Sequence, residues 1–401
     1  MSTDFDVLVV GAGIQGAGAA EALAEAGYRV AILEQIGIAA ATSSRSSKLI
    51  HGGLRYLESG QFHLVYECLR ERRWLLMNKP QLVRMVPFYI PVYRHSRRSP
   101  WTVRLGLTLY ALLAGVISGQ SRFRSVPRRE WEQLSGLVHE DLIAVYRYYD
   151  AQTDDAALTR NVVESAVARG AQLICPGSLV GAELTSQGMR VDYVADGQLN
   201  TLRARVLVNC SGPWVSNTND RCAPQVPLPP LELVAGTHIE LPISLGDKIF
   251  YVEAEDGRAI FVMPWQGRTL VGTTERSYRG DPRDVAPTLE EEQYLLQTVQ
   301  RYFPQTRQLR GKDICDSWAG LRVLPQSKDT PFSRPRDTLI CCDNSRRPRV
   351  LAVAGGKLTS YRATARKIVK TLRPTLDSAE PDQPGECTTA SSPNRSEKEN
   401  H

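Results

Sequence analysis

Apolar and polar residues alternate with two different periods along this chain, and the pattern predicts a protein built from both strands and helices. Residues 5–10 are mostly apolar, as in a buried strand, and residues 17–26 have the composition of a helix that Gly27 can end. Residues 28–33 form a second apolar run. Together these segments predict a strand, a helix and a parallel strand at the N-terminus.

The rest of the chain continues both patterns. Apolar residues recur at helical spacing in residues 61–78 and 154–169, and Thr288 with Glu291 predicts a capping box at the start of a further helix. Strands are expected at residues 172–175, 178–184, 190–195, 205–209 and 350–354, with an antiparallel meander at residues 248–254, 259–264 and 269–274.

The composition narrows the class of protein. With 401 residues the chain can hold two intertwined domains, and its apolar content of 42% is ordinary for a globular protein. The eight cysteines include no C-x-x-C pair and no ligand-like spacing with histidine. We therefore expect reduced thiols in a cytoplasmic protein, no metal site and no signal peptide.

The net charge of +6 owes much to the arginines between residues 94 and 129. No nucleic-acid-binding motif accompanies them, so nucleic acid is not an expected partner. An anionic membrane surface or an anionic substrate fits this charge, and a solvated arginine-rich face is an equally good alternative. The apolar run at residues 105–118 is too short to span a membrane, so a buried helix is favoured over an interfacial one.

A glycine-rich turn follows the first predicted strand. In Gly11-x-Gly13-x-x-Gly16 the glycines permit a tight turn, close approach to a diphosphate and close packing of helix on strand. Glu34 ends the second strand, where a carboxylate can accept hydrogen bonds from ribose hydroxyls and would repel a 2′-phosphate. The fingerprint predicts FAD or NAD. Glycine turns after two later strands, at Gly212 and Gly356, favour FAD because a long cofactor would meet several strand ends.

Seven motifs then resemble, in chain order, those of the FAD-dependent glycerol-3-phosphate dehydrogenases, within the D-amino-acid-oxidase-like flavoprotein group. They are DVLVVGAGIQGAG, ATSSRSSKLIHGGLRYLE, VNCSGPWV, AGTHIELP, FVMPW with LVGTTE, AGLRVLP and AGGKLTSYR. The resemblance covers residues 5–370. It implies FAD as cofactor and oxidation of sn-glycerol 3-phosphate to dihydroxyacetone phosphate, with hydride passing to flavin N5. In the bacterial dehydrogenases the electrons go on to quinone, and in the related oxidases they go to oxygen.

The resemblance also implies a fold and a division into domains. We expect an α/β protein in which an α+β substrate domain, built on an antiparallel sheet, is inserted into a Rossmann-type FAD-binding domain. The FAD-binding domain would comprise residues 1–80, 146–218 and 346–372, and the substrate domain residues 81–145 and 219–345. Residues 373–401 have a polar composition that predicts a disordered tail.

Substrate and catalytic residues follow from the same motifs. The substrate is nearly a dianion at neutral pH, and Arg55 and Arg322 stand at positions that match the family's phosphate-binding arginines. Tyr56 is a candidate for a hydrogen bond to the substrate or for packing. A base with a pKa near 7 would take the proton from the C2 hydroxyl, with His51 favoured and His238 as the second candidate. Lys357 would contact the substrate or steady negative charge on the flavin.

Further cofactor-binding residues are expected by the same match. Besides Gly11, Gly13, Gly16 and Glu34, they are Ser43, Ser44, Ser46, Lys48, Leu49, Val180, Gly212, Gly356, Lys357 and Thr359.

Several alternatives stay open at this point. Many bacterial members of the family continue into a helical C-terminal domain where this chain has only a short polar stretch. The chain is therefore expected to be a quinone-linked dehydrogenase, with contact to the inner face of the cell membrane and a homodimer left open. The alternatives are an oxidase that uses oxygen, a non-catalytic FAD-binding relative, and an amine or amino-acid oxidase, which the arginine pair disfavours.

Overall fold

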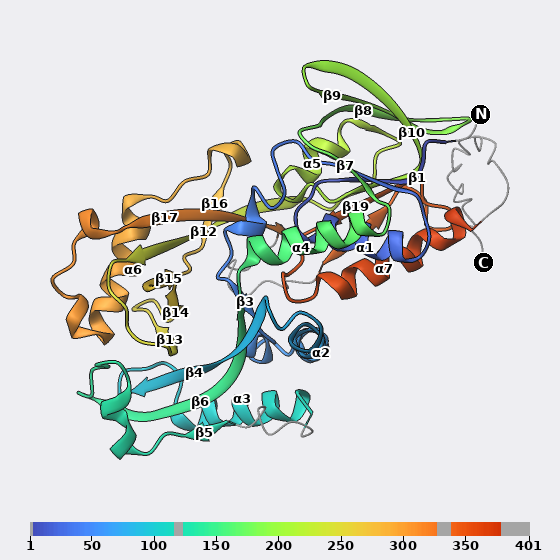
Figure 1. The fold of residues 1–401 in the computed structure, drawn as a ribbon. Coiled ribbons are helices and arrows are strands. Elements are labelled where there is room, and N and C mark those ends of the chain that lie inside the picture. The colour runs from blue at the N-terminus through green and yellow to red at the C-terminus, as the bar shows by residue number, and fades with distance from the viewer. Residues whose placement is uncertain (1–2, 116–122, 327–337, 378–401) are drawn as a thin grey trace, which may run out of the picture.

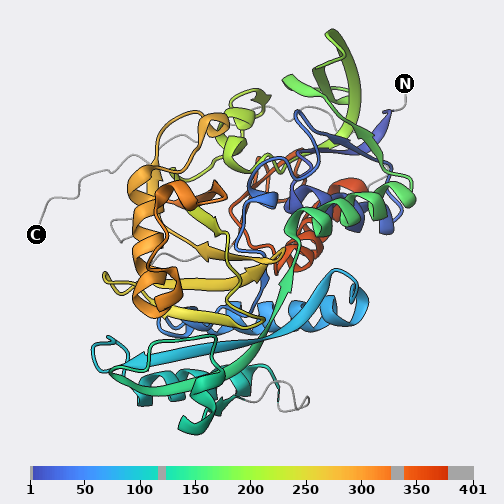
Figure 2. The ribbon, with the colours of Figure 1, turned by 60° about the vertical axis from the view of Figure 1, so that its left-hand side comes forward.

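The computed structural model describes residues 3–115, 123–326 and 338–377, and in these residues the chain forms two β-sheets (Figures 1 and 2). The described part of the first sheet has nine strands and that of the second has ten. The first carries parallel strands and the second is mainly antiparallel, which confirms the expected fold class.

Parallel strands form the centre of the first sheet. Strand β1 (Phe5–Val10) pairs with β2 (Val30–Leu33) on one side and with β10 (Gln198–Asn209) on the other, and β10 pairs in parallel with β19 (Val350–Ala354). Strands β1, β2 and β19 are nearly continuous apolar runs, as is the part of β10 at residues 206–208, because both faces of the sheet are covered there. Their carboxyl ends consequently meet at one edge of the sheet.

Three helices pack together over one face of this sheet, as Figure 1 shows. They are α1 (Ile14–Glu25), α4 (Asp155–Ala168) and α7 (Tyr361–Leu376). Outside the parallel centre, the sheet continues through β7 (Gln172–Ile174), β8 (Ser178–Thr185), β9 (Gly188–Ala195), β11 (Cys222–Ala223) and β18 (Leu339–Cys342).

The second sheet brings distant parts of the chain together. Strand β12 (Leu231–Leu241) pairs along its length with β17 (Asp316–Pro325), and β4 (Val83–Tyr93) pairs with β6 (Leu142–Thr153). The remaining strands are β3 (Leu49–Ile50), β5 (Arg124–Ser125), β13 (Ile249–Glu253), β14 (Ala259–Trp265), β15 (Arg268–Gly272) and β16 (Arg276–Tyr278). The short strand β3 connects this sheet to the loop that follows the first βαβ unit.

Three more helices of eight residues or more pack against the second sheet. Helix α6 (Leu289–Tyr302) begins at the expected capping box, because the Thr288 hydroxyl accepts the Glu291 N–H and the Glu291 side chain accepts the Thr288 N–H. Helices α2 (Phe62–Asn78) and α3 (Pro100–Leu113) lie beside β4 and β6 (Figure 1).

Helix α3 starts earlier than the apolar run alone suggested, because Ser99 caps it and Pro100 occupies its first turn. Val103, Leu107 and Tyr110 are buried, whereas Trp101, Leu105 and Leu112 are exposed. It is thus buried on one face only, and residues 116–118 of the expected helix lie outside the described residues. No helix in the described part of the chain is long and apolar enough to cross a membrane.

The expected division into domains stays a prediction, and two of its boundaries can be compared with the course of the strands. The expected boundary at residue 146 falls within β6, and β18 belongs to the first sheet although it precedes residue 346. Helix α7 continues through residues 373–376, where the Arg205 guanidinium donates to the carbonyl oxygens of Thr375 and Leu376. The rest of the expected tail lies outside the described residues.

Candidate active site at the junction of the two sheets

Three adjoining cavities extend from the carboxyl ends of the parallel strands to the second sheet. The first has a volume of about 730 Å³, the second about 260 Å³ and the third about 100 Å³. Ser43 and Gly212 line both the first and the second cavity, and His51 and Arg322 line both the second and the third. The three cavities therefore form one elongated site.

The glycine fingerprint shapes the start of the first cavity. A Cβ on Gly11, whose φ is +102°, would stand 2.6 Å from the carbonyl oxygen of Cys210, and one on Gly16 would stand 1.9 Å from the carbonyl oxygen of Gly11. Helix α1 begins directly after Gly13, which has no side chain to cap it, and the Ser43 hydroxyl accepts the N–H of Ile14 at 2.9 Å. Its N-terminus is thus placed to bind an anion in the cavity.

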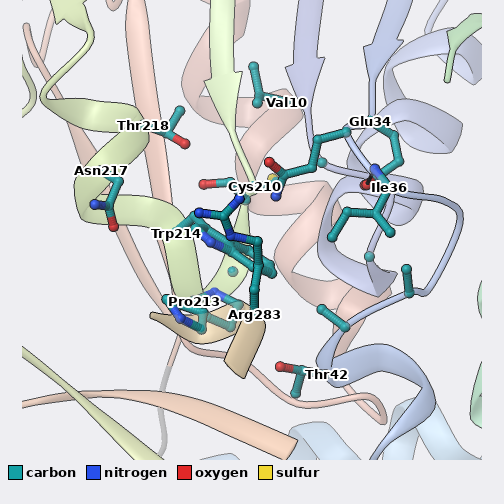
Figure 3. A pocket seen from close by; sticks show the side chains of 18 of the residues that line it. Val10, Glu34, Ile36, Thr42, Cys210, Pro213, Trp214, Asn217, Thr218 and Arg283 are labelled. Carbon is teal, nitrogen blue, oxygen red and sulfur yellow. Dashed lines mark hydrogen bonds between the residues drawn. The ribbon is translucent and has the colours of Figure 1, made fainter. Parts of the chain in front are cut away.

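Glu34 lines the same cavity at the end of β2 (Figure 3). One of its carboxylate oxygens accepts the Ala12 N–H at 2.7 Å, and the other accepts the Ile36 N–H at 2.8 Å. These backbone bonds fix the carboxylate where ribose hydroxyls are expected. Oε1 also accepts the Gly37 N–H at 3.3 Å, so Oε2 is the oxygen that retains a lone pair for a hydroxyl.

Most of the expected cofactor residues line the first or second cavity. They are Gly11, Gly13, Glu34, Ser43, Ser46, Leu49, Gly212, Gly356, Lys357 and Thr359. Gly16, Ser44, Lys48 and Val180 do not. Lys48 is instead buried in an ion pair with Asp155, 2.8 Å from Nζ to Oδ1, and the Lys48 ammonium also donates to the carbonyl oxygen of Ser44.

Val180 lies where the pairing of β8 with β9 shifts register, between Leu179 and Gly181. Leu179 lines the first cavity, whereas the side chain of Val180 is half exposed to solvent. The role of Val180 at the adenine end of the cofactor stays a prediction.

Three arginines surround the third and smallest cavity. Arg55 and Arg322 were expected there, and Arg258 joins them from the turn before β14. One nitrogen of the Arg322 guanidinium lies 2.9 Å from a carboxylate oxygen of Glu275, and the other lies 3.4 Å from the hydroxyl of Thr273. Arg258 is also paired with Asp256, 2.6 Å from Nε to the carboxylate oxygen. Three guanidinium groups still line the cavity against one lining carboxylate, so it suits an anion.

Sequence reasoning missed Arg258 and Glu275. Glu275 ends the LVGTTE motif, which the resemblance had already singled out, so that motif offered a signal for it. Arg258 follows the turn at residues 255–257 and resembles any exposed turn residue in the sequence. Only the pairing of β13 with β14 brings it to the site.

The two candidate histidines have different surroundings. His51 lines the second and third cavities, and its backbone N–H donates to the hydroxyl of Thr359 at 3.1 Å. His238 is 1% exposed, with Nε2 2.9 Å from the Ser47 hydroxyl and its ring stacked on Trp318. Burial, together with the positive charges of Arg322 and Lys48, lowers the pKa of His238 to about 3.

Lys357 and Tyr56 lie against each other at the second cavity. The Lys357 ammonium is 3.6 Å from the centroid of the Tyr56 ring, a cation–π contact, and Tyr56 extends into the third cavity as well. The structure thus brings Lys357 and Tyr56 together between the two smaller cavities. Within the described ranges, no cluster of three or more His, Cys, Asp or Glu side chains could hold a metal ion.

A family model described as "FAD dependent oxidoreductase" matches residues 6–362. The chain belongs to this family. Glycerol-3-phosphate dehydrogenase of Pseudomonas aeruginosa is 38% identical to it, over 92% of this chain and 72% of the relative. D-erythritol 1-phosphate dehydrogenase of Brucella abortus is 35% identical, over 92% of this chain and 73% of the relative.

Solved structures agree with this assignment of family. Glycerol-3-phosphate dehydrogenase of Bacillus halodurans complexed with FAD superposes with a TM-score of 0.71 at 27% identity, covering 94% of this chain. This chain spans 66% of the length of that structure. L-alpha-glycerophosphate oxidase of Mycoplasma pneumoniae gives a TM-score of 0.72 at 16% identity, which shows the shared fold alone.

The site of this FAD-dependent oxidoreductase fits its cofactor. The first cavity offers the N-terminal end of α1 and Glu34 to a diphosphate and a ribose, and the second offers the glycine turns at Gly212 and Gly356 to a flat ring. Space at Gly212 is open, since a Cβ there would meet no atom within 4 Å. The FAD expected from the sequence is confirmed as the cofactor.

The lowered pKa of His238 predicts a loss of stability in acid. The folded protein keeps this imidazole neutral, whereas the unfolded chain binds a proton below its ordinary pKa of 6.5. Stability from this group is therefore complete above pH 7 and is lost as the pH falls toward 3. Between pH 7 and pH 5 we expect the unfolding free energy to drop by about 2 kcal/mol through His238.

Urea denaturation of the FAD-loaded protein at several pH values measures this drop. In His238→Gln the slope of stability against pH between 5 and 7 should flatten, whatever the absolute stability of the variant. His63→Gln, an exposed position in α2, should retain the wild-type slope. An unchanged slope in His238→Gln would show that His238 is not held neutral.

Proposed function

We propose that this flavoprotein oxidises sn-glycerol 3-phosphate to dihydroxyacetone phosphate. The observation that carries the proposal is the third cavity, in which Arg55, Arg258 and Arg322 surround a space of about 100 Å³ directly beside the cofactor cavity. A phosphate monoester is nearly a dianion at neutral pH, and planar guanidinium groups match its oxygens in pairs. Bound FAD supplies a two-electron acceptor for the alcohol carbon.

We infer that His51 takes the proton from the C2 hydroxyl of the substrate. His51 lines both the second and the third cavity, so a substrate whose phosphate lies in the third cavity would present its neighbouring carbon to His51. His238 is a much weaker base, because a group with a pKa of about 3 binds a proton poorly near neutrality. Lys357 would stabilise negative charge on the reacting oxygen from its place beside Tyr56.

The two named relatives act on different substrates of the same chemical class. Both names specify a phosphate ester of a small polyol, and the first relative's substrate is the shorter one. The small volume of the third cavity supports the three-carbon substrate, because a longer polyol would need more room between the arginines and the cofactor.

Quinone is the proposed final electron acceptor, at a membrane surface. The support is helix α3, which exposes Trp101, Leu105 and Leu112 beside Arg104. An aromatic and aliphatic face next to cations is typical of helices that lie in a membrane interface. Stoichiometric hydrogen peroxide under air, with no gain in rate from a quinone analogue, would instead identify an oxidase.

Anaerobic mixing with glycerol 3-phosphate tests the proposed reaction. The yellow absorbance of bound FAD should bleach within minutes, and D-erythritol 1-phosphate should bleach it more slowly. In His51→Ala, bleaching should slow by roughly two orders of magnitude or more while FAD stays bound, since a positioned base contributes on this scale. Persistent yellow colour in the wild type would indicate a non-catalytic FAD-binding protein. Unchanged bleaching in His51→Ala would move the base to His238.

A further inference from the structure

A loop that follows a strand of the second sheet lines the first cavity. It connects β16 to α6, and its residues Arg279, Gly280, Asp281, Pro282 and Arg283 all line the cavity. The Arg283 side chain extends from this loop into the cavity (Figure 3). None of these residues belongs to the glycine fingerprint or to the expected cofactor set.

The loop has a defined shape. The Tyr278 hydroxyl donates to the carbonyl oxygen of Asp281 at 2.8 Å, and the Asp281 side chain accepts the Arg283 N–H at 2.9 Å across a turn begun by Pro282. Val285, just after the turn, is buried against Leu321 of β17. The second sheet therefore fixes where the Arg283 side chain begins.

The charge around the first cavity favours an anion. Arg221, Arg279 and Arg283 line it, against the carboxylates of Glu34 and Asp281. Glu34 is engaged by backbone N–H groups, and the Arg221 guanidinium donates to the carbonyl oxygen of Leu179. Asp281 holds Arg283 through Nε and Nη2, with the closest approach at 2.7 Å. In the described part of the chain no hydrogen bond from the Arg283 Nη1 is formed, so this donor is available to a ligand.

We propose that Arg283 binds the diphosphate of FAD, so that the cofactor is held between the fingerprint turn of the first sheet and a cation from the second. A guanidinium on a diphosphate oxygen forms a charge-assisted hydrogen bond, and Asp281 pre-orients the group before FAD arrives. The contact ties the β16–α6 loop to the cofactor. It depends on FAD binding and not on which substrate is oxidised.

Titration of FAD into the apoprotein, followed by flavin fluorescence, tests the contact. In Arg283→Gln the dissociation constant for FAD should rise about tenfold, and its dependence on salt should weaken. ADP, which carries a diphosphate, should compete about tenfold less well in the variant, whereas adenosine should compete as in the wild type. Arg307→Gln, an exposed arginine outside the cavity, should leave all of these values unchanged.

A second measurement uses the unaltered protein. If FAD engages this loop, it should slow tryptic cleavage of the Arg279–Gly280 bond, which mass spectrometry of the released peptides can follow. The proposal is overturned by a dissociation constant within twofold of wild type in Arg283→Gln, by equal weakening of adenosine, or by cleavage that FAD does not slow. Each readout is independent of catalysis, so a failure here and a failure to oxidise glycerol 3-phosphate remain separate results.

Discussion

Replacing Arg322 with alanine should lower kcat/KM for glycerol 3-phosphate at least roughly thirtyfold, which corresponds to a loss of more than about 2 kcal/mol of transition-state stabilisation. The loss has two sources. The substrate phosphate loses a guanidinium in the third cavity, and Glu275, whose side chain is 6% exposed, loses the partner that lies 2.9 Å away. With one guanidinium fewer beside the Glu275 carboxylate, the cavity would attract the dianion less strongly. Steady-state kinetics should place most of the change in KM.

Two control variants separate these effects. Arg322→Lys keeps the charge but not the paired geometry, so it should recover only part of the loss. Arg268→Ala removes an arginine from β15 that pairs with Glu240 and lines none of the three cavities, and it should leave kcat/KM unchanged. Wild-type kinetics in Arg322→Ala, with FAD still bound, would remove the third cavity as the phosphate site.

The sequence was most informative where function depends on consecutive residues. The turn from Gly11 to Gly16 needs glycine for contacts made within one βαβ unit, so its spacing could be interpreted without knowledge of the rest of the fold. The capping box of Thr288 and Glu291 is equally local, and it is confirmed. Local geometry restricts the residue types at such positions, and for that reason they can be recognised in a single sequence.

Positions that depend on the pairing of distant strands could not be derived in this way. Arg258 reaches the third cavity only because β14 pairs with β13 and β15, and the β16–α6 loop reaches the first cavity only because β12 pairs with both β16 and β17. Lys48 is predicted to contact the cofactor only through the motif match, and the sequence gives no sign of its ion pair. Its ion-pair partner, Asp155, lies 107 residues further along the chain.

The second large prediction concerns a buried polar network that holds the backbone at Gly52. Arg72 of α2 forms an ion pair with Asp150 of β6, and both side chains are almost fully buried. The Tyr110 hydroxyl of α3 donates to the same carboxylate and accepts the N–H of Gly52 at 2.8 Å. Because Gly52 directly follows His51, this network fixes the backbone next to the proposed base.

Arg72→Met should therefore destabilise the protein by about 3–5 kcal/mol, since it leaves the Asp150 charge buried without its partner. Chemical denaturation measures this change, with Arg70→Met as the matched control because Arg70 is an exposed arginine of the same helix. The double variant Arg72→Met with Asp150→Asn removes both charges and should recover much of the loss. If Arg72→Met alone costs no more than Arg70→Met, then Asp150 carries no charge in the folded protein, and the Gly52 amide is held by a neutral hydrogen-bond network.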